Sequence, residues 1–256
     1  MCLIVFAWRP GHPQPLIVAA NRDEFYARPS LPLAHWDDRP GVYAGRDLKA
    51  GGTWLGISDS GRFAALTNIR DMQLPQGGPS RGELVADFLH GRQTAEEYLS
   101  GLSARAAGYA GFNLLLGNAQ QLWHFNQQQG TAQQLPAGLY GLSNADLDSP
   151  WPKLQRAKAA LANCLAEPQT ASLLNLLQDA QPAADADLPD TGVGVQIERL
   201  LSSVFIASPG YGTCASTALI VHQDGRRQIA ERRFGPAGVL LGETCLVVRQ
   251  AQAVEA

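Results

Sequence analysis

The chain opens with two apolar segments joined by a turn that is rich in proline and glycine. Residues 3–8 and 16–20 carry only apolar side chains, many of them β-branched, as is typical of strands. Because successive side chains of a strand point to opposite faces, a strand that is apolar throughout must be covered on both faces. A fold that contains such strands therefore needs a layer of structure on each side of the sheet.

Beyond this opening, groups of strands alternate with groups of helices. Asp59-Ser60-Gly61 lies between two apolar segments and predicts a hairpin, and Gly117-Asn118 does the same for residues 111–117 and 121–125. Capping boxes that begin at Ser80 and Thr94 predict two helices. Helical spacing of apolar residues predicts further helices over 151–167, 171–180 and 197–201. Strands are expected over 204–206, 213–222, 226–234 and 240–249, and loops over 25–47 and 181–190.

This separation of strands from helices predicts an α+β fold with largely antiparallel sheets. Residues 3–8 and 114–116 are apolar on both faces, which favours two stacked sheets flanked by helices. The predicted architecture is a four-layer αββα sandwich. No internal repeat and no shift in composition marks a boundary, so a single domain over residues 1–256 is expected.

Composition excludes several classes of function. The 256 residues are 45% hydrophobic, which is enough to bury a large core. The net charge is −3 and the basic residues are scattered, so no nucleic-acid partner is expected. The four cysteines and five histidines lack metal-ligand spacing, so no metal site is expected. Such irregularly spaced cysteines fit free thiols in a reducing compartment.

The sequence also lacks the signature of a membrane span. No apolar segment approaches the length of a transmembrane helix. The N-terminal apolar segment resembles part of a signal peptide, but it is short, has no basic region before it and is followed by Arg9 and three prolines. We therefore expect a cytoplasmic protein. The sequence does not define its oligomeric state.

Cys2 is the residue with the clearest chemical potential. Removal of Met1 would leave Cys2 at the N-terminus, where one residue carries both a thiol nucleophile and an α-amine with an ordinary pKa near 8. That amine can accept the thiol proton and later protonate a leaving amine. The plain alternative is a small, inert core residue at the start of a strand, because free cysteines are commonly buried.

Polar residues at the ends of predicted strands supply partners for Cys2. Asn21-Arg22-Asp23-Glu24 follows the second apolar segment, and an antiparallel return would bring it beside Cys2. In a functional interpretation Asp23 binds the α-amine and Arg22 favours the thiolate. Asn68 and Asn144 also end predicted strands and could donate to an oxyanion, although each alone is more typical of a turn or cap residue.

Two further motifs favour structural roles. The glycines of residues 51–56 precede a strand and lack the lysine of a phosphate-binding loop, so they are expected to permit tight turns or close strand approach. Ser80 and Glu83 are interpreted as helix caps. The tryptophans, Trp54 among them, are more typical of a core than of a stacking platform.

Together these residues resemble the NRDE-motif family, that is, the transport and Golgi organisation protein 2 family. The resemblance covers nearly the whole chain, with its motifs in the same order. The matching residues are Met1-Cys2 before an apolar strand, Asn21-Arg22-Asp23-Glu24, Gly51 to Gly56, Leu66-Thr67-Asn68, Ser80-Arg81-Gly82, Gly111-Phe112-Asn113-Leu114, Gly141-Leu142-Ser143-Asn144 and Tyr211-Gly212-Thr213.

The resemblance implies the N-terminal-nucleophile hydrolase fold and a set of catalytic residues. By similarity to the cysteine branch of that superfamily, which includes penicillin V acylase and bile salt hydrolase, the catalytic positions are Cys2, Arg22, Asp23, Asn68 and Asn144. Asn21, Trp54 and Arg70 are expected to contact substrate. One departure stands out, because the family commonly has Gly-Thr-Arg where this chain has Gly212-Thr213-Cys214. Either Arg70, Arg232 or Arg233 replaces the missing cation, or catalysis is weakened or absent.

Two hypotheses of function follow. The first is an amidohydrolase that cleaves a non-peptide C–N amide bond of a small molecule, with Cys2 as nucleophile and no cofactor. The second is a non-enzymatic trafficking protein that uses the same fold to bind haem or an acyl-CoA-like lipid. Retention of Met1 would favour the second, because a capped Cys2 has no free amine to act as a base.

Overall fold

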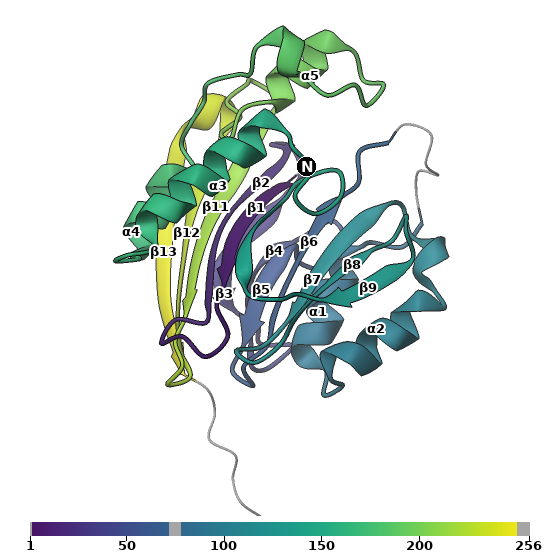
Figure 1. The fold of residues 1–256 in the computed structure, drawn as a ribbon, viewed down its shortest axis with the longest axis vertical. Coiled ribbons are helices and arrows are strands. Elements are labelled where there is room, and N and C mark those ends of the chain that lie inside the picture. Colours follow the sequence, from purple (N-terminus) through teal and green to yellow (C-terminus); the bar gives the residue numbers. More distant parts are fainter. Residues whose placement is uncertain (1, 72–77, 250–256) are drawn as a thin grey trace, which may run out of the picture.

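The two apolar opening segments pair as antiparallel strands inside the first of two β-sheets. The computed structural model describes residues 2–71 and 78–249, and Figure 1 shows its two sheets facing each other with helices outside them. The first sheet has six strands, which run in the order β10 (Gly138–Leu142), β1 (Cys2–Trp8), β2 (Leu16–Phe25), β11 (Tyr211–Val221), β12 (Arg226–Phe234) and β13 (Leu240–Arg249). Strand β1 is thus paired on both edges.

The second sheet has seven strands in the order of the chain. They are β3 (Ser30–His35), β4 (Val42–Asp47), β5 (Leu55–Ser58), β6 (Phe63–Asn68), β7 (Phe112–Gly117), β8 (Leu122–Asn126) and β9 (Thr131–Gln134). All strand pairings among the described residues are antiparallel. The hairpins predicted on either side of Asp59-Ser60-Gly61 and Gly117-Asn118 are confirmed as β5–β6 and β7–β8.

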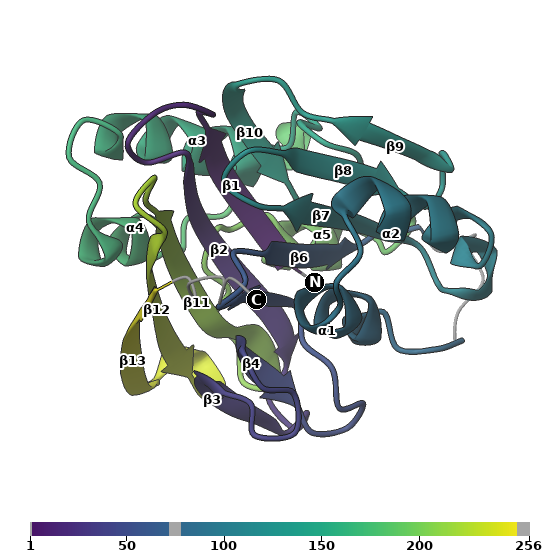
Figure 2. The same ribbon diagram turned by 90° about the horizontal axis from the view of Figure 1, so that it is seen from below.

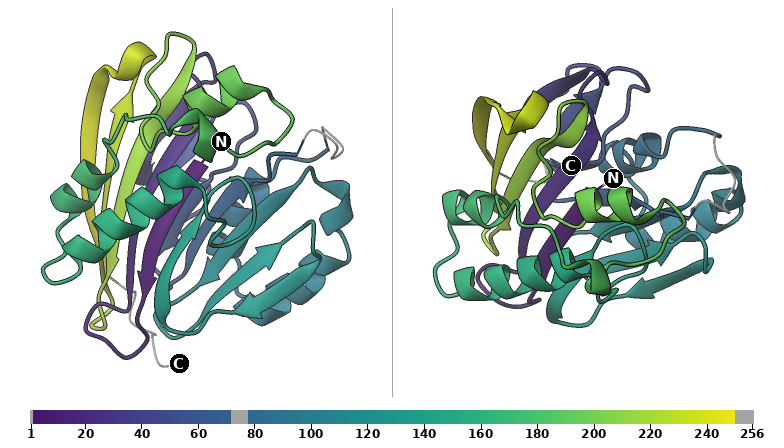
Figure 3. Two further views of the ribbon diagram at one scale, coloured as in Figure 1. Left: turned by 45° about the horizontal axis from the view of Figure 1, so that its top comes forward. Right: turned by 90° about the horizontal axis from the view of Figure 1, so that it is seen from above.

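Helices cover the outer face of each sheet. Figure 2 shows α3 and α4 on one side of the molecule and α1 and α2 on the other. Helix α5 lies at the end of the sandwich where β1 begins (Figures 1 and 3). The α-helices are α1 (Gly82–His90), α2 (Ala95–Ser103), α3 (Pro152–Cys164), α4 (Thr170–Leu176) and α5 (Val195–Leu201), and the short 3₁₀ turns are η1 (Ala106–Gly108), η2 (Asp185–Asp187) and η3 (Pro236–Gly238).

Three apolar clusters hold the four layers together. The side chains of β1 alternate between two of them, since Ile4 and Phe6 pack between the sheets while Leu3 and Val5 pack against α3 and α4. A third cluster lies between the second sheet and helices α1 and α2. Apolar strands buried on both faces thus have the layer on each side that they require. The predicted α+β, four-layer αββα sandwich is confirmed.

The long loop expected over residues 25–47 is wrong, because this segment contains the edge strand β3 and its neighbour β4. Strand β3 is largely exposed and includes Pro32, and its pairing with β4 shifts register between Leu31 and Ala34. A polar edge strand interrupted by such a shift lacks the regular alternation that marks a strand in sequence.

The strand expected over residues 204–206 is also wrong. These residues are buried but form no ladder with a neighbouring strand, although the Ile206 carbonyl accepts from the Thr213 amide of β11. The amide of Phe205 donates to the carbonyl of Asp179, that of Ile206 donates to Thr213 Oγ1, and the carbonyl of Val204 accepts from Asn21.

Of the two capping boxes, one is confirmed and one is wrong. Thr94 accepts from the amide of Glu97, and the Glu97 carboxylate accepts from the amide of Thr94. At the other site α1 begins after Arg81, no side chain caps it, and the Glu83 carboxylate accepts from the Tyr109 hydroxyl instead.

Candidate active site

The pairing of β1 with β2 determines which residues surround Cys2. Cys2 lies opposite Arg22, and Leu3 lies opposite Asn21. The antiparallel return predicted from the two apolar segments is therefore confirmed. On the other edge of β1, the hydroxyl of Ser143 donates to the Cys2 carbonyl at 3.1 Å, which joins the residues after β10 to the first residue of β1.

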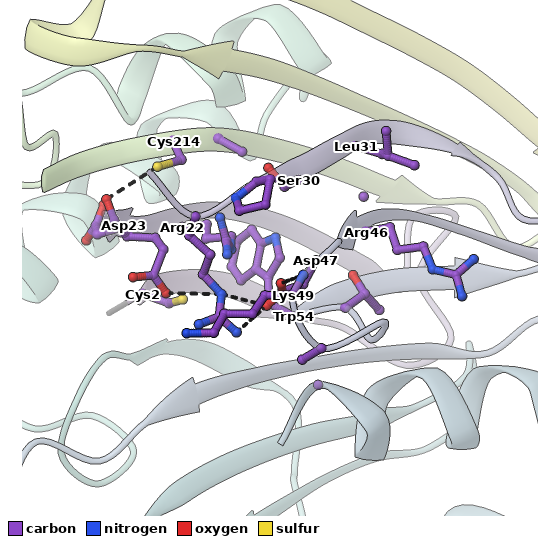
Figure 4. Close-up of a pocket in the computed structure, with 18 of the residues that line it drawn as sticks. Cys2, Arg22, Asp23, Ser30, Leu31, Arg46, Asp47, Lys49, Trp54 and Cys214 are labelled. Atoms are coloured by element: carbon purple, nitrogen blue, oxygen red, sulfur yellow. Dashed lines mark hydrogen bonds and ion pairs between the residues drawn. The ribbon is translucent and has the colours of Figure 1, made fainter. Parts of the chain in front are cut away.

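A cavity of about 800 Å³ opens beside Cys2, at one end of the two sheets. Figure 4 shows Cys2, Arg22 and Trp54 close together, with Cys214 above them in this view. Its walls come from both sheets and from the segment that precedes α1. The predicted site residues that line it are Cys2, Arg22, Asp23, Trp54 and Asn68.

The Cys2 thiol is buried, with 6% of the residue exposed. Burial raises its pKa and the charge of Asp23 raises it further, whereas Arg22 and a hydrogen bond from the Asp23 amide lower it. The Cys2 side chain thus faces one cation, one carboxylate and one backbone donor. The cation and the carboxylate are the groups that the sequence predicted beside Cys2.

Asp23 is held rigidly on β2. Its Oδ1 accepts from the hydroxyl of Thr213 on β11 at 2.8 Å, and its backbone carbonyl accepts from the Tyr211 hydroxyl. Burial raises the pKa of the Asp23 carboxyl, while the charge of Lys153 and the Thr213 hydrogen bond lower it. A carboxylate fixed by a neighbouring strand in this way can hold an amine in one position.

Asn21 occupies the opposite face of β2 from Arg22. Its side-chain nitrogen donates to the carbonyls of Val204 and Leu177, at 2.8 Å and 3.1 Å, and its oxygen accepts from Ser216. These contacts bury the amide completely and place it outside the cavity. The position differs from the expected substrate contact, because one residue along a strand reverses the face.

Asn68 and Asn144 differ in whether their side chains can contact a ligand in the cavity. Asn68 ends β6 and lines the cavity. Asn144 is fully buried, donates from its side-chain nitrogen to the Asn68 carbonyl at 2.8 Å, and accepts from the Ser143 hydroxyl. Because β6 belongs to the second sheet and Asn144 follows β10 of the first, this hydrogen bond joins the two sheets beside Cys2.

Trp54 and Arg70, both expected to contact substrate, occupy different places. Trp54 lines the cavity. Arg70 does not, because its guanidinium forms an ion pair with Glu198 of α5 at 2.8 Å and lies over the Trp151 ring. The Arg70 side chain therefore holds α5 and α3 together beyond the end of β6, outside the cavity.

Of the three arginines considered as replacements for the cation absent at position 214, only one lines the cavity. Arg233 of β12 does so, and its neighbour Arg232 points to the other face, where it binds Glu243 and Asn175. Cys214 itself lies in an irregularity between β2 and β11 and also lines the cavity, and burial raises its thiol pKa to about 11.

Arg81 and Lys153 contribute to the site although sequence reasoning gave neither a role. Arg81 lines the cavity and donates to the Gly111 carbonyl, and the Cys2 and Glu24 charges both raise its pKa against the larger lowering by burial. A Cβ at Gly52 would clash with the backbone of Gly82, so the glycine allows the close approach that sets Arg81 beside the cavity. The Ser80-Arg81-Gly82 motif was the sequence feature that could have identified Arg81 as a site residue.

Lys153 of α3 is 2% exposed, and its ammonium nitrogen has no hydrogen-bond partner among the described residues. Burial lowers its pKa to about 8, while the charges of Asp23 and Cys2 raise it. A lysine in the first turn of an amphipathic helix carries no signal that it will be buried. Only the fold places it behind Asp23.

Two general features of the described residues complete the picture. No group of three or more histidine, cysteine or acidic side chains in residues 2–71 and 78–249 is arranged to hold a metal ion. In the same part of the chain, every helix is too short or too polar to cross a bilayer.

Two solved structures resemble this one. A mutant of the conjugated bile acid hydrolase from Clostridium perfringens has a TM-score of 0.54 at 7% identity, covering 96% of this chain and 92% of that one. A Caenorhabditis elegans ortholog of N-acylethanolamine-hydrolyzing acid amidase has a TM-score of 0.47 at 12% identity, covering 86% and 92%. Identities this low show the fold alone, which is that of the N-terminal-nucleophile hydrolases, as expected from the sequence.

The sequence has closer relatives. The family described as Transport and Golgi organisation 2 matches residues 1–236. The Homo sapiens Transport and Golgi organization protein 2 homolog is 36% identical over 259 residues, which cover 91% of this chain and 92% of the human protein. The Drosophila melanogaster Transport and Golgi organization protein 2 is 30% identical over 260 residues, covering 90% and 91%. The chain therefore belongs to the Transport and Golgi organisation 2 family.

Proposed function

We propose that this protein is an amidohydrolase that cleaves a non-peptide C–N amide bond, with Cys2 as its nucleophile once Met1 has been removed. One observation carries the proposal: the Cys2 thiol borders an 800 Å³ cavity beside a cation, a carboxylate and a backbone N–H group. The fold shared with the conjugated bile acid hydrolase from Clostridium perfringens is consistent with a hydrolase.

In the proposed reaction the Cys2 sulfur adds to the amide carbonyl carbon as the thiol proton passes to the Cys2 α-amine. The C–N bond then breaks, and the α-ammonium returns that proton to the leaving amine, which leaves a thioester. Water adds to the thioester carbonyl, its proton again goes to the α-amine, and the sulfur departs with the electron pair of the C–S bond. The products are a carboxylic acid and an amine.

The surrounding residues have separate tasks in this scheme. Asp23, fixed by Thr213, orients the α-amine, and Arg22 stabilises the thiolate. The Asn68 side chain, which lines the cavity, donates to the oxyanion. Asn144 positions Asn68 by donating to its backbone carbonyl.

The first prediction concerns the nucleophile. Cys2→Ala should lower hydrolysis of small N-acyl amides by on the order of a thousandfold or more, because the variant lacks the one thiol that shares its residue with the α-amine base. Circular dichroism should show an unchanged fold. Cys214→Ala is the matched control, since Cys214 also lines the cavity but should be dispensable. Equal turnover by Cys2→Ala and the parent protein would refute the mechanism.

The α-amine requires its own test. Intact-mass measurement of the natively expressed protein should give a mass that lacks one methionine. A folded protein that retains Met1 and still hydrolyses amides would contradict the role given to the α-amine.

The haem-binding alternative receives less support from the residues in the cavity. Its lining residues include no histidine or methionine among those described, so the side chains able to bind haem iron are Cys2, Cys214 and Tyr26. Burial raises the pKa of all three, which favours protonated groups that bind iron poorly.

All four cysteines are free, as the cytoplasmic location that we propose would maintain them.

A further inference from the structure

The cavity is cationic although the chain as a whole is acidic. Six basic side chains line it, Arg22, Arg28, Arg46, Lys49, Arg81 and Arg233, against the four acidic ones Asp23, Glu24, Asp47 and Glu231. The net charge of the chain is −3. A local excess of positive charge in a concave site attracts anions.

Two of these arginines lie in a row that begins at the thiol. Cys2 lies opposite Arg22 across β1 and β2, and Arg22 lies opposite Ala215 of β11. Ala215 in turn lies opposite Arg233 of β12. Residues directly opposite one another in neighbouring strands share a face of the sheet, and all four line the cavity. Along this row the side chains are therefore, in order, a thiol, a cation, a methyl group and a second cation.

Both guanidinium groups are available to a ligand. Arg28 and Arg46 are paired with Asp47 and Asp38, whereas neither Arg22 nor Arg233 has an ion pair with a described residue. The Arg233 Nε is buried without a hydrogen-bond partner among the described residues. Burying part of a cation without a counter-charge is costly unless a ligand supplies one.

Glu231 lies two residues before Arg233, on the same face of β12, and does not neutralise it directly. One of its carboxylate oxygens accepts from the Leu33 amide at 2.8 Å. Burial raises the Glu231 pKa, although the Arg233 charge opposes this. The Arg233 guanidinium instead lies over Gly242, where a Cβ would come within 2.8 Å of Nη2.

Apolar side chains lie at the same end of the cavity. Leu31 and Leu241 both line it, and they are 50% and 58% exposed. Exposed leucines beside a cationic pocket favour a ligand that joins an anionic group to an apolar chain.

We propose that Arg233 binds an anionic group of the substrate, so that the amide cleaved at Cys2 belongs to an amphiphilic molecule bearing a carboxylate or a phosphate. The proposal relies on the proposed function only for the position of the scissile bond. A guanidinium binds either anion through two parallel N–H donors. Spacing between strands is about 4.8 Å, so three strand steps separate the Cα atoms of Cys2 and Arg233 by about 14 Å.

The test measures binding without turnover. In the Cys2→Ala protein, isothermal titration calorimetry compares 8-(decanoylamino)octanoic acid, whose carboxylate is far enough from the amide to reach Arg233, with its uncharged counterpart 8-(decanoylamino)octanamide. The acid should bind at least about tenfold more tightly, since a charge-assisted hydrogen bond is worth that much. Adding Arg233→Met should abolish the preference. Arg232→Met is the matched control and should keep it, because that side chain points to the other face.

A phosphate probe and a conservative variant complete the experiment. If 8-(decanoylamino)octyl phosphate binds more tightly than the octanoic acid and depends equally on Arg233, the site stands and its anion is a phosphate. Arg233→Lys should retain part of the preference, which separates loss of charge from loss of fold.

Equal binding of the acid and its uncharged amide, absence of binding by every probe, or a preference that survives Arg233→Met would overturn the proposal. Binding with no hydrolysis by the parent protein would instead count against the amidohydrolase and leave the anion site intact.

Discussion

At the scale of single residues, Lys153 gives the sharpest consequence for stability. Its pKa in the folded protein is about 8, against an ordinary value of 10.5. Below pH 8 both the folded and unfolded states hold the proton, and the cost of the buried ammonium is complete. Between pH 8 and 10.5 the folded state has lost the proton and the unfolded state has not, so the free energy of unfolding rises with pH.

This rise amounts to about 3 kcal/mol, from about 1.4 kcal/mol for each pKa unit. Urea denaturation of the parent protein and of Lys153→Met, at intervals from pH 7 to pH 10, measures it. The variant should be the more stable of the two at pH 7, and the difference should shrink as the pH approaches 10. A constant difference between the two proteins across this range would show that Lys153 does not titrate as described.

The candidate site also shows what single residues reveal in sequence. Cys2, Arg22 and Asp23 were identified because they cluster at the ends of two strands whose pairing was predictable. Asn21 is next to Arg22 in the chain but faces the helices, where it bonds to Val204 and Leu177. The face of a polar residue at the end of a strand is set by pairing partners far along the chain, so no local pattern distinguishes the two.

At the scale of secondary-structure elements, the two capping sequences of α1 and α2 make a matched pair. Thr94→Ala should lower the free energy of unfolding by about 1 kcal/mol, because its hydroxyl accepts from the Glu97 amide. Ser80→Ala should cost less than half as much, because no side chain caps α1. Chemical denaturation of both variants measures the difference. Equal losses would mean that the hydroxyl of Ser80 also caps a helix.

Elements with a regular apolar pattern were predictable, and those stabilised by distant partners were not. The strands β5 to β8 and the final three strands follow their sequence patterns closely. Strand β3 is mostly exposed, and the amide of its Leu33 donates to Glu231 of the other sheet. Residues 204–206 are apolar like a strand, yet Asn21 and Thr213 satisfy their backbone groups in place of a ladder.

At the scale of the whole molecule, the packing of the two sheets tests the single domain expected from the sequence. The central cluster combines Ile4 and Val18 of the first sheet with Ile57 and Leu115 of the second. We therefore expect one cooperative unfolding transition, with coincident curves from far-ultraviolet circular dichroism and tryptophan fluorescence. Two separated transitions would show that the sheets unfold independently.

A core variant sharpens this test. Leu115→Ala should move both curves together and cost about 3 kcal/mol, as for other fully buried leucines. Leu48→Ala, at an exposed position, is the control and should change the free energy of unfolding by less than about 1 kcal/mol. If Leu115→Ala shifted only one of the two curves, the central cluster would not couple the sheets.

The layers of the molecule could be predicted because strands apolar on both faces demand them. The cavity could not be predicted, because β2 near the start of the sequence pairs with β11 near its end. The register between these two strands decides which side chains meet. Arg233 is one residue from Arg232 in sequence, yet only this register places it in line with Cys2.

The row from Cys2 to Arg233 runs across the strands, perpendicular to their length. The number of strands in the row therefore sets the distance between Cys2 and Arg233. Backbone hydrogen bonding holds neighbouring strands about 4.8 Å apart, so the distance from Cys2 to the arginine at the end of the row changes only in whole strand spacings. Placing the arginine at position 215 and the alanine at position 233 would shorten the distance from Cys2 to the arginine by one strand spacing, without altering the fold. Substrate length is thereby encoded in which strand carries the arginine.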